Sequence, residues 1–398
     1  MVKADIHYRL TCMKILYITS HYNPFDVSTG SGQRYNLLLR ACAQIGEVDV
    51  VTFTDGVKSD ISGVKVGYSH SIPLKLYEGR ANRFKRLWRP WTLYSFFEKD
   101  AKRSAIVEDI VKRNNYDLIV TRYIPIACQC GLLKYADKLV IDVDDDPIDV
   151  QLTLSKNAHT KRAQLYYRIL ARLMDHAIKA FLNKVHFAFF PNAMQMRGKR
   201  VAYLPNVPYY EIEPLSVPRA DNHRIFFVGD LRYKPNILGI EHFVEGIFPS
   251  IKERVSDAEL FIAGRNYGEE WTSKMEQVNG VHVLGFVEDL RKEYEKSTIC
   301  VVPVYSGAGT NIKVLEALRM NRACVVSEEA TRGFMNILED RKDYLVAQND
   351  EQFIDKVCLL LQDSEYASTL AQQGLDTLNQ HYSIEAFNSI VKKALIHG

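Results

Sequence analysis

The segment from Val304 to Arg319 constrains the fold most, because it joins the end of an apolar strand to the start of a helix through a glycine turn. Gly307 and Gly309 can adopt backbone angles closed to other residues, so consecutive N–H groups can converge on an anion. The helix that follows presents its unpaired N–H donors and its positive dipole end at the same place. The pattern predicts a phosphate-binding corner made of Gly307, Ala308, Gly309, Thr310 and Asn311.

Two charged residues follow in the expected helix. Lys313 adds a positive charge one turn in, and Glu316 lies three residues later on the same helical face. The two acceptor oxygens of a carboxylate can bind the hydroxyls of a cis-diol such as ribose. A phosphate site followed by a diol site indicates a nucleotide. The alternative is an ordinary strand–turn–helix corner without a ligand.

Length and composition indicate a two-domain globular protein. The chain has 398 residues, and domains average on the order of 150 residues. Seven cysteines without regular spacing argue against a disulfide framework and for a reducing compartment, and the close pair Cys128 and Cys130 is interpreted as buried thiols. A net charge of +3 is too small to indicate nucleic-acid binding. No apolar run reaches the roughly 18 residues of a membrane span, and the polar first ten residues are unlike a signal peptide.

Short apolar runs alternate with amphipathic stretches in both halves of the chain, which predicts α/β domains with parallel sheets covered by helices. Helices are expected at 33–45, 98–114 and 161–181. Strands are expected at 15–19, 48–53, 117–123, 139–143 and 186–190, and again at 225–228, 260–263, 282–284, 299–304 and 323–327. Four prolines between Pro205 and Pro218 mark a boundary between two doubly wound domains.

The glycine corner resembles the signature of the retaining glycosyltransferases of the GT-B fold, family 4, the group 1 glycosyltransferases. That family usually has a Glu, seven residues and a second Glu. Here Glu316 matches the second Glu, whereas Ala308 stands at the place of the first. A branch of the family with Gly-x-Gly-Thr-x-x-Lys-x-Leu-Glu shares this departure, which removes one expected contact to the donor sugar.

The resemblance implies two Rossmann-like domains that face each other across a cleft. Residues 13–206 would bind the acceptor, 207–223 would be a proline-rich linker, and 224–382 would bind the nucleotide sugar. Residues 383–398 would form a last helix that packs back on the first domain, with Ser383 as its N-cap.

A second basic turn follows the expected strand 225–228. Gly229 is followed by Arg232 and Lys234, which match the cations that hold the donor diphosphate in the family. Such charge-assisted bonds would also stabilise the departing nucleoside diphosphate. The alternative for each is a solvated basic turn. We assign donor binding to Gly229, Ala308, Glu316 and the glycine corner, and catalysis to Lys313, Arg232, Lys234 and Asp144.

The first strand is followed by Gly30, Gly32 and Arg34. A dinucleotide motif is excluded here, because Tyr35 takes the third glycine position and no acidic residue ends the next strand. The GT-B resemblance instead implies a glycine turn that faces the cleft. Arg122 at the end of strand 117–123 would face the cleft as well, unless it only ends a surface strand.

Four carboxylates crowd the end of strand 139–143, at Asp142 and 144–146. They repel one another unless cations or hydroxyls lie among them, and strand alternation turns Asp142 and Asp144 to one side. Relatives in the family carry His-Asp near this place on the acceptor side, where this chain has Asp144 and Asp145. An exposed acidic loop or a metal site are the alternatives. We expect no metal, because GT-B enzymes generally use protein cations and no Cys or His spacing indicates a ligand set.

Residues 79–103 combine eight Lys or Arg with two acids and with aromatic side chains such as Trp88 and Trp91. This composition predicts a patch for an anionic membrane surface, which would suit a lipid-linked acceptor. The alternative is a solvated helix whose aromatics pack inward.

The expected activity is transfer of a sugar from a nucleotide diphosphate sugar to an acceptor hydroxyl with retention, with no metal and no nucleic acid. The sequence offers no spaced nucleophile and acid of the kind that retaining hydrolases use. The expected chemistry is therefore front-face substitution, in which the leaving phosphate accepts the acceptor proton. We expect a cytoplasmic protein, peripheral on the inner face of the membrane. The alternatives are a GT-B epimerase or phosphorylase, or a non-catalytic subunit that binds sugar nucleotides.

Overall fold

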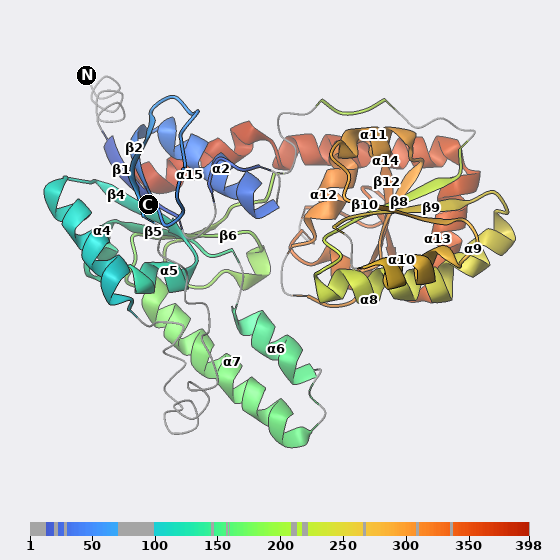
Figure 1. Cartoon of the computed structure of the whole chain (residues 1–398), viewed down its shortest axis with the longest axis horizontal. Helices are drawn as coiled ribbons and strands as arrows, with labels where there is room; N and C mark the ends of the chain where they lie inside the picture. The colour runs from blue at the N-terminus through green and yellow to red at the C-terminus, as the bar shows by residue number, and fades with distance from the viewer. Residues whose placement is uncertain are drawn as a thin grey trace. The chain divides into compact units, whose positions relative to one another are not determined.

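The structure is a computed structural model in which two compact units are distinguished. It describes residues 13–19, 23–27, 30–70, 99–144, 147–156, 158, 160–207, 213–216, 222–265, 268–307, 310–334 and 337–397. Unit 1 comprises residues 1–206 and 384–398, and unit 2 comprises 207–383. Each unit has one sheet with helices around it (Figure 1). The predictions for Asp145, Ala308, Gly309, residues 79–98 and much of the 207–223 linker lie outside the described residues.

Unit 1 contains a seven-stranded sheet in the order β3-β2-β1-β4-β5-β6-β7, with parallel pairing throughout. The order reverses between β1 and β4, which pair directly. Ligands of doubly wound sheets bind outside the carboxyl ends of the strands at such a reversal. The strands are β1 (Met13–Ile18), β2 (Gly46–Thr52), β3 (Val64–Ser69), β4 (Leu118–Arg122), β5 (Leu139–Asp142), β6 (Phe187–Phe190) and β7 (Val201–Tyr203).

Helices cover this sheet, and several of them begin at side-chain caps. Asp100 accepts from the Arg103 N–H at 2.9 Å, and Thr160 accepts from the Ala163 N–H at 3.2 Å. The helices are α2 (Gly30–Ala43), α4 (Ala101–Arg113), α5 (Ile124–Gln129), η2 (Leu132–Lys138), α6 (Pro147–Lys156), α7 (Lys161–Leu182), η3 (Ala193–Gln195) and α15 (Ile384–His397).

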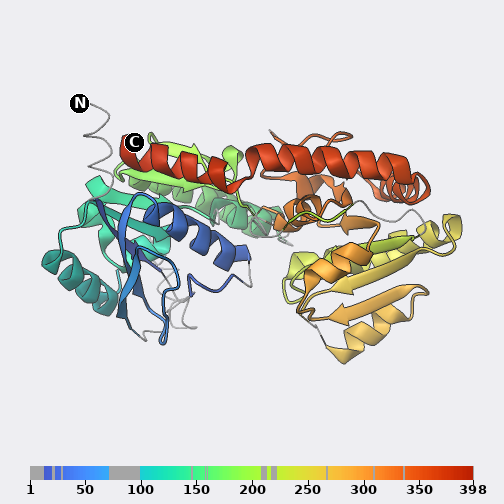
Figure 2. The ribbon, with the colours of Figure 1, turned by 90° about the horizontal axis from the view of Figure 1, so that it is seen from above.

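The last helix belongs to unit 1, although the residues before it belong to unit 2. Helix α15 packs against α2, and Figure 2 shows the two helices side by side. Phe387 and Val391 are fully buried there. Ser383 occupies the position just before the helix begins, as the sequence predicted.

Unit 2 contains a six-stranded sheet in the order β10-β9-β8-β11-β12-β13, again parallel. Its order reverses between β8 and β11. The strands are β8 (Arg224–Val228), β9 (Glu259–Ala263), β10 (Val281–Gly285), β11 (Ile299–Val302), β12 (Ala323–Ser327) and β13 (Leu345–Ala347). The helices are α8 (Lys234–His242), the π-helix η4 (Phe243–Ile247), α9 (Phe248–Arg254), α10 (Glu269–Glu276), α11 (Leu290–Lys296), α12 (Ile312–Arg319), η5 (Glu328–Thr331), α13 (Asp350–Gln362) and α14 (Ser364–His381).

Helix α8 lies unusually close to the end of β11. A Cβ atom on Gly239 would stand 1.8 Å from the carbonyl oxygen of Pro303, so only glycine fits at this crossing. The close approach fixes α8 beside the segment that leads from β11 to α12. That placement positions the candidate site of unit 2.

Candidate functional site

The predicted nucleotide residues of unit 2 gather where its strand order reverses. Gly229 directly follows β8, and Gly307 lies between β11 and α12. Strands β8 and β11 are paired neighbours, so these two connections leave the same edge of the sheet side by side. Doubly wound sheets bind their ligands outside this edge, at the point where the strand order reverses.

Lys313 in the first turn of α12 is held by side chains from two elements. Its Nζ donates to Asn236 Oδ1 of α8 at 3.0 Å and to Asn311 Oδ1 at 3.5 Å. Asn236 in turn donates to the carbonyl oxygen of Asp230 at 3.0 Å, which ties the turn after β8 to Lys313. Asn236 was not predicted from the sequence, because its partner Lys313 lies 77 residues away along the chain.

Lys313 and Glu316 are both half-buried, and their pKa values are displaced toward each other. Burial lowers the pKa of Lys313 to about 8, and the charge of Glu316 opposes this shift. Burial also raises the pKa of Glu316 to about 7, opposed by Lys313. Shifts of this kind, in a crevice, are typical of functional groups.

The glycine corner has further unusual features in its described part. Gly307 has a φ of 134°, and its carbonyl oxygen accepts from Arg332 Nη1 at 3.2 Å. The hydroxyl of Thr310 is buried and has no hydrogen-bond partner among the residues that the structure describes. Buried hydroxyls without a partner are uncommon, and this one lies in the predicted phosphate corner. Asn311 is the N-cap residue of α12, and its Nδ2 donates to the Ala330 carbonyl at 3.4 Å.

Arg232 and Lys234 are both exposed. The guanidinium of Arg232 is bound by Asp230, with 2.9 Å from Nε to Oδ1 and 2.7 Å from Nη2 to Oδ2. This bond raises the pKa of Arg232 and lowers that of Asp230. Lys234 is the first residue of α8. Their role in holding a diphosphate stays a prediction.

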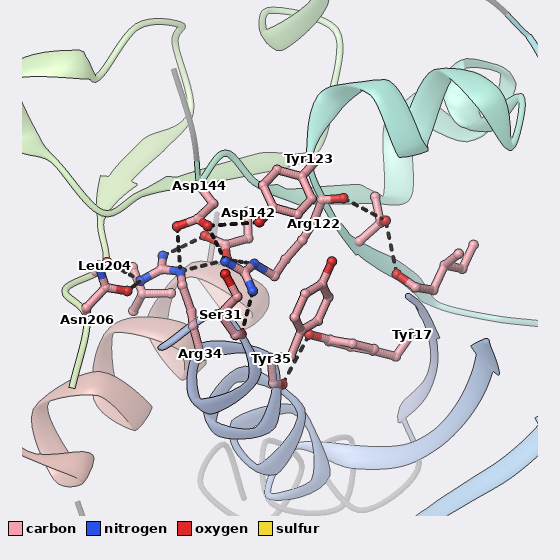
Figure 3. A network of polar contacts seen from close by, with 12 residues as sticks. Tyr17, Ser31, Arg34, Tyr35, Arg122, Tyr123, Asp142, Asp144, Leu204 and Asn206 are labelled. Atoms are coloured by element: carbon pink, nitrogen blue, oxygen red, sulfur yellow. Dashed lines mark hydrogen bonds and ion pairs between the residues drawn. The ribbon is translucent and has the colours of Figure 1, made fainter. Parts of the chain in front are cut away.

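A cluster of two arginines and two aspartates lies at the carboxyl ends of the strands of unit 1 (Figure 3). Arg34 of α2 donates two hydrogen bonds to the carboxylate of Asp142, at 2.8 Å from Nε to Oδ2 and at 2.6 Å from Nη2 to Oδ1. Arg122 of β4 reaches the same carboxylate, with its Nε 3.1 Å from Oδ2. These three side chains are at most 2% exposed. The arginines are therefore the cations that the crowded carboxylates required.

Arg34 also has a structural role that was not predicted from the sequence. Its Nη1 donates to the carbonyl oxygens of Leu204 and Pro205 and to Asn206 Oδ1, at 3.0, 3.1 and 3.0 Å. The side chain thus fastens α2 to the segment that ends unit 1. A part in acceptor binding stays a prediction for Arg34, whose donors are used within the protein.

The two predicted glycines lie within a helix and not in a turn before it. Gly30 is the first residue of α2 and Gly32 the third. Between them, the carbonyl oxygen of Ser31 accepts from Arg122 Nη1 at 2.8 Å. Arg122 therefore fixes the start of this helix to the end of β4.

Asp144 is the partly exposed member of the cluster, with a side-chain exposure of 16%. Its Oδ2 accepts from Arg122 Nη2 at 2.5 Å and from the Tyr123 hydroxyl at 3.1 Å. Burial opposes the charge on Arg122, yet Asp144 and Asp142 keep the pKa of its guanidinium above the usual value. Tyr123 has a φ of 65°, rare for a residue other than glycine. Its strained backbone turns the hydroxyl toward Asp144, a contact that the sequence did not suggest.

The described part of the chain contains no group of three or more His, Cys, Asp or Glu side chains that could hold a metal ion. None of its helices is both long and apolar enough to cross a membrane.

The two units together define a class of protein. Over 96% of this chain and 98% of the other, the fold is similar to that of sucrose-phosphate synthase from Thermosynechococcus elongatus, with a TM-score of 0.69 and 15% identity. It is also similar to Anabaena Alr3699/HepE, solved with UDP-glucose, over 96% of this chain and 99% of that one, with a TM-score of 0.62 and 12% identity. The fold is the two-unit α/β fold of GT-B glycosyltransferases.

A family match covers part of the sequence. Residues 222–363 match the model of the family described as Glycosyl transferases group 1. The matched segment lies within unit 2. A Klebsiella pneumoniae relative, described as an uncharacterized 44.6 kDa protein in the cps region, is 22% identical over 316 residues, which cover 76% of this chain and 80% of the relative.

Proposed function

We propose that this protein transfers a sugar, with retention of anomeric configuration, from a nucleotide diphosphate sugar to a hydroxyl of a saccharide or lipid-linked acceptor. One observation carries the proposal. Lys313 and Glu316 stand on one face of α12 at the strand-order reversal of unit 2, inside the segment that matches the family. A cation for phosphate and a carboxylate for ribose are what a nucleotide requires there.

Each residue of this site has a distinct role in the proposal. Lys313 and the backbone N–H groups of 307–310 bind the diphosphate, and Glu316 accepts hydrogen bonds from the ribose hydroxyls. Arg232 and Lys234 extend the positive charge toward the leaving group. Protein cations take the place of a metal ion. UDP-glucose bound to the Anabaena protein of similar fold supports a nucleotide sugar as donor.

Catalysis in this proposal is positioning and charge stabilisation. The phosphate oxygen that leaves the sugar takes the proton of the attacking hydroxyl, and Lys313 stabilises the charge of the departing diphosphate. Asp144 of unit 1, whose side chain is 16% exposed, accepts a hydrogen bond from the acceptor in this proposal. NMR of the product checks retention, since an inverted linkage contradicts it.

The biological setting is proposed from the relatives. The Klebsiella relative lies in a cps region, and another protein of similar fold is the lipopolysaccharide outer core galactosyltransferase WaaB. We propose a role in polysaccharide, lipopolysaccharide or other glycoconjugate assembly, in the cytoplasm at the inner face of the membrane.

A thermal-shift panel of sugar nucleotides tests the donor site. One member of the panel should raise the melting temperature of the wild-type protein, because a ligand that binds only the folded state stabilises it. Glu316→Ala should lower the affinity for that ligand roughly 10- to 150-fold, which is the loss expected for hydrogen bonds to a charged group. Glu253→Ala, at an exposed site of α9, is the matched control and should leave the shift unchanged. An equal shift in both variants refutes the ribose role of Glu316.

A further inference from the structure

Helices α6 and α7 form a hairpin that extends away from the sheet of unit 1 (Figure 1). Its two arms are bonded to each other near the connection. Ser155 Oγ donates to the Gln164 carbonyl at 2.9 Å, and Gln164 Nε2 donates to the Ala158 carbonyl at 3.1 Å. We call residues 152–173 the hairpin tip.

Only one end of α7 is packed into the protein. Its buried residues all lie between Ala171 and Leu182. The ten residues before Ala171 include no buried residue, although they carry large apolar side chains. Leu165, Tyr166 and Ile169 are 60%, 57% and 49% exposed, and Leu173 in the next turn is 47% exposed. Exposed apolar side chains that gather on one helix mark an interaction surface.

The tip is basic as well as apolar. It contains five Lys or Arg and no Asp or Glu, the basic residues being Lys156, Lys161, Arg162, Arg168 and Arg172. All five are exposed, and none is within ion-pair distance of a carboxylate in the described part of the chain. Nearer the sheet the charges are neutralised, since Asp175 pairs with Lys179 at 2.7 Å and with Arg197 at 3.3 Å.

The apolar and the basic side chains lie along adjacent faces of α7. Leu165, Ile169 and Leu173 are four residues apart, so they form one stripe along the helix. Arg168 and Arg172 have the same spacing and form a second stripe beside the first. On α6, Leu152 and Leu154 add apolar surface, each 42% exposed.

We propose that the hairpin tip docks on an anionic lipid surface. The apolar stripe of Leu165, Ile169 and Leu173 would lie among the acyl chains, and the basic stripe of Arg168 and Arg172 would lie at the headgroups. Amphipathic helices that combine exposed leucines with Lys and Arg bind such surfaces, and the long basic side chains reach the headgroups while their stems stay apolar. A second copy of the chain fits less well. In a two-fold interface the same patch meets itself, and the five unpaired cations would repel one another.

This surface is distinct from the basic aromatic stretch 79–103 that the sequence suggested for the same kind of partner. It also does not rest on the transferase proposal, because docking requires neither donor nor turnover. Its consequence for that proposal is that unit 1 would meet an acceptor carried on a lipid at the membrane surface.

Vesicle flotation tests the docking surface. Wild-type protein should float with vesicles of phosphatidylcholine mixed with phosphatidylglycerol and remain behind with phosphatidylcholine alone. Replacement of Arg162, Arg168 and Arg172 by Glu should weaken flotation at least about tenfold, because each basic residue near an anionic surface contributes to binding. Replacement of Leu165, Ile169 and Leu173 by Gln should also weaken it. Lys58, Lys392 and Lys393, all exposed on unit 1, are the matched control when replaced by Glu, and should leave flotation nearly unchanged.

Several outcomes overturn the proposal. These are no flotation of the wild type, equal flotation of both tip variants, and loss of flotation only when Arg83, Lys85, Arg86 and Arg89 are replaced by Glu. A further outcome is a wild-type protein that is a dimer and does not float. If replacement of Leu165, Ile169 and Leu173 by Gln then turns this dimer into a monomer, the surface is an interface with a second copy. An unchanged melting temperature and sugar-nucleotide shift in each variant shows that folding and donor binding are intact, so a failed docking prediction stays separate from a failed transferase proposal.

Discussion

Lys313 and Glu316 have pKa values displaced toward each other, to about 8 and about 7. Lys313 must be protonated to bind a diphosphate, so affinity should fall as the pH rises through about 8. Glu316 must be ionised for both of its oxygens to accept hydrogen bonds, so affinity should also fall as the pH drops through about 7. Isothermal titration of the sugar nucleotide across this range should therefore give a bell with its maximum between the two values.

Single substitutions separate the acid limb and the alkaline limb of this bell-shaped pH dependence of affinity. Lys313→Arg keeps its charge at high pH and should remove the alkaline limb. Glu316→Gln should remove the acid limb and move the alkaline limb to lower pH, because the charge of Glu316 holds the pKa of Lys313 up. Affinity that does not change between pH 6 and pH 9, about one unit beyond each pKa, would contradict the assignment of these groups to the donor site.

At the scale of elements, the crossing of α8 over the end of β11 fixes the geometry of the site. Gly239→Ala would push a Cβ into the Pro303 carbonyl oxygen, 1.8 Å away, and the overpacking should lower the free energy of unfolding by about 1–3 kcal/mol or more. Gly246→Ala is the matched control, because the nearest atom to its Cβ is His242 Cε1 at an ordinary 3.6 Å. Alanine there should be neutral or stabilising by up to about 1 kcal/mol.

Urea denaturation of the two variants makes the comparison. Equal unfolding free energies would show that α8 can shift at no cost and that the close crossing does not hold Asn236 against Lys313. A loss confined to Gly239→Ala, accompanied by weaker sugar-nucleotide binding, is the expected result.

The elements that sequence predicted are those with continuous apolar runs. Strands β5, β6 and β12 are buried on both faces, and their runs were recognised at nearly the observed bounds. Strands β3, β7 and β13 were missed. They lie at sheet edges, where β3 alternates between half-buried and exposed residues, and β7 and β13 have three residues each. Such short or half-exposed segments have little apolar signal.

Some residues of the candidate site could be predicted from the sequence, and others could not. Lys313 and Glu316 were found because their meaning depends on local spacing within one helix. The partners Asn236 and Asp142 were not assigned as partners, because Lys313 lies 77 residues from the first and Arg34 lies 108 residues from the second. Pairing over such distances is set by the strand order of each sheet, which no local pattern contains.

The whole molecule consists of two units of the same architecture with different chemistry at their strand ends. Unit 1 presents a mostly buried arginine–aspartate cluster with Asp144 partly exposed, and unit 2 presents the glycine corner with Lys313 and Glu316. The chain enters unit 2 once and returns to unit 1 in α15. The family match at 222–363 lies within unit 2, the unit to which we assign the proposed donor.

A crystal structure of the whole protein with the sugar nucleotide identified in the thermal-shift panel would test the proposed donor site. We expect the diphosphate at hydrogen-bond distance, about 3 Å, from Lys313 Nζ and the backbone N–H groups of 307–310, with the ribose hydroxyls on Glu316. A nucleotide bound at another place, or one whose ribose is turned away from Glu316, would contradict it.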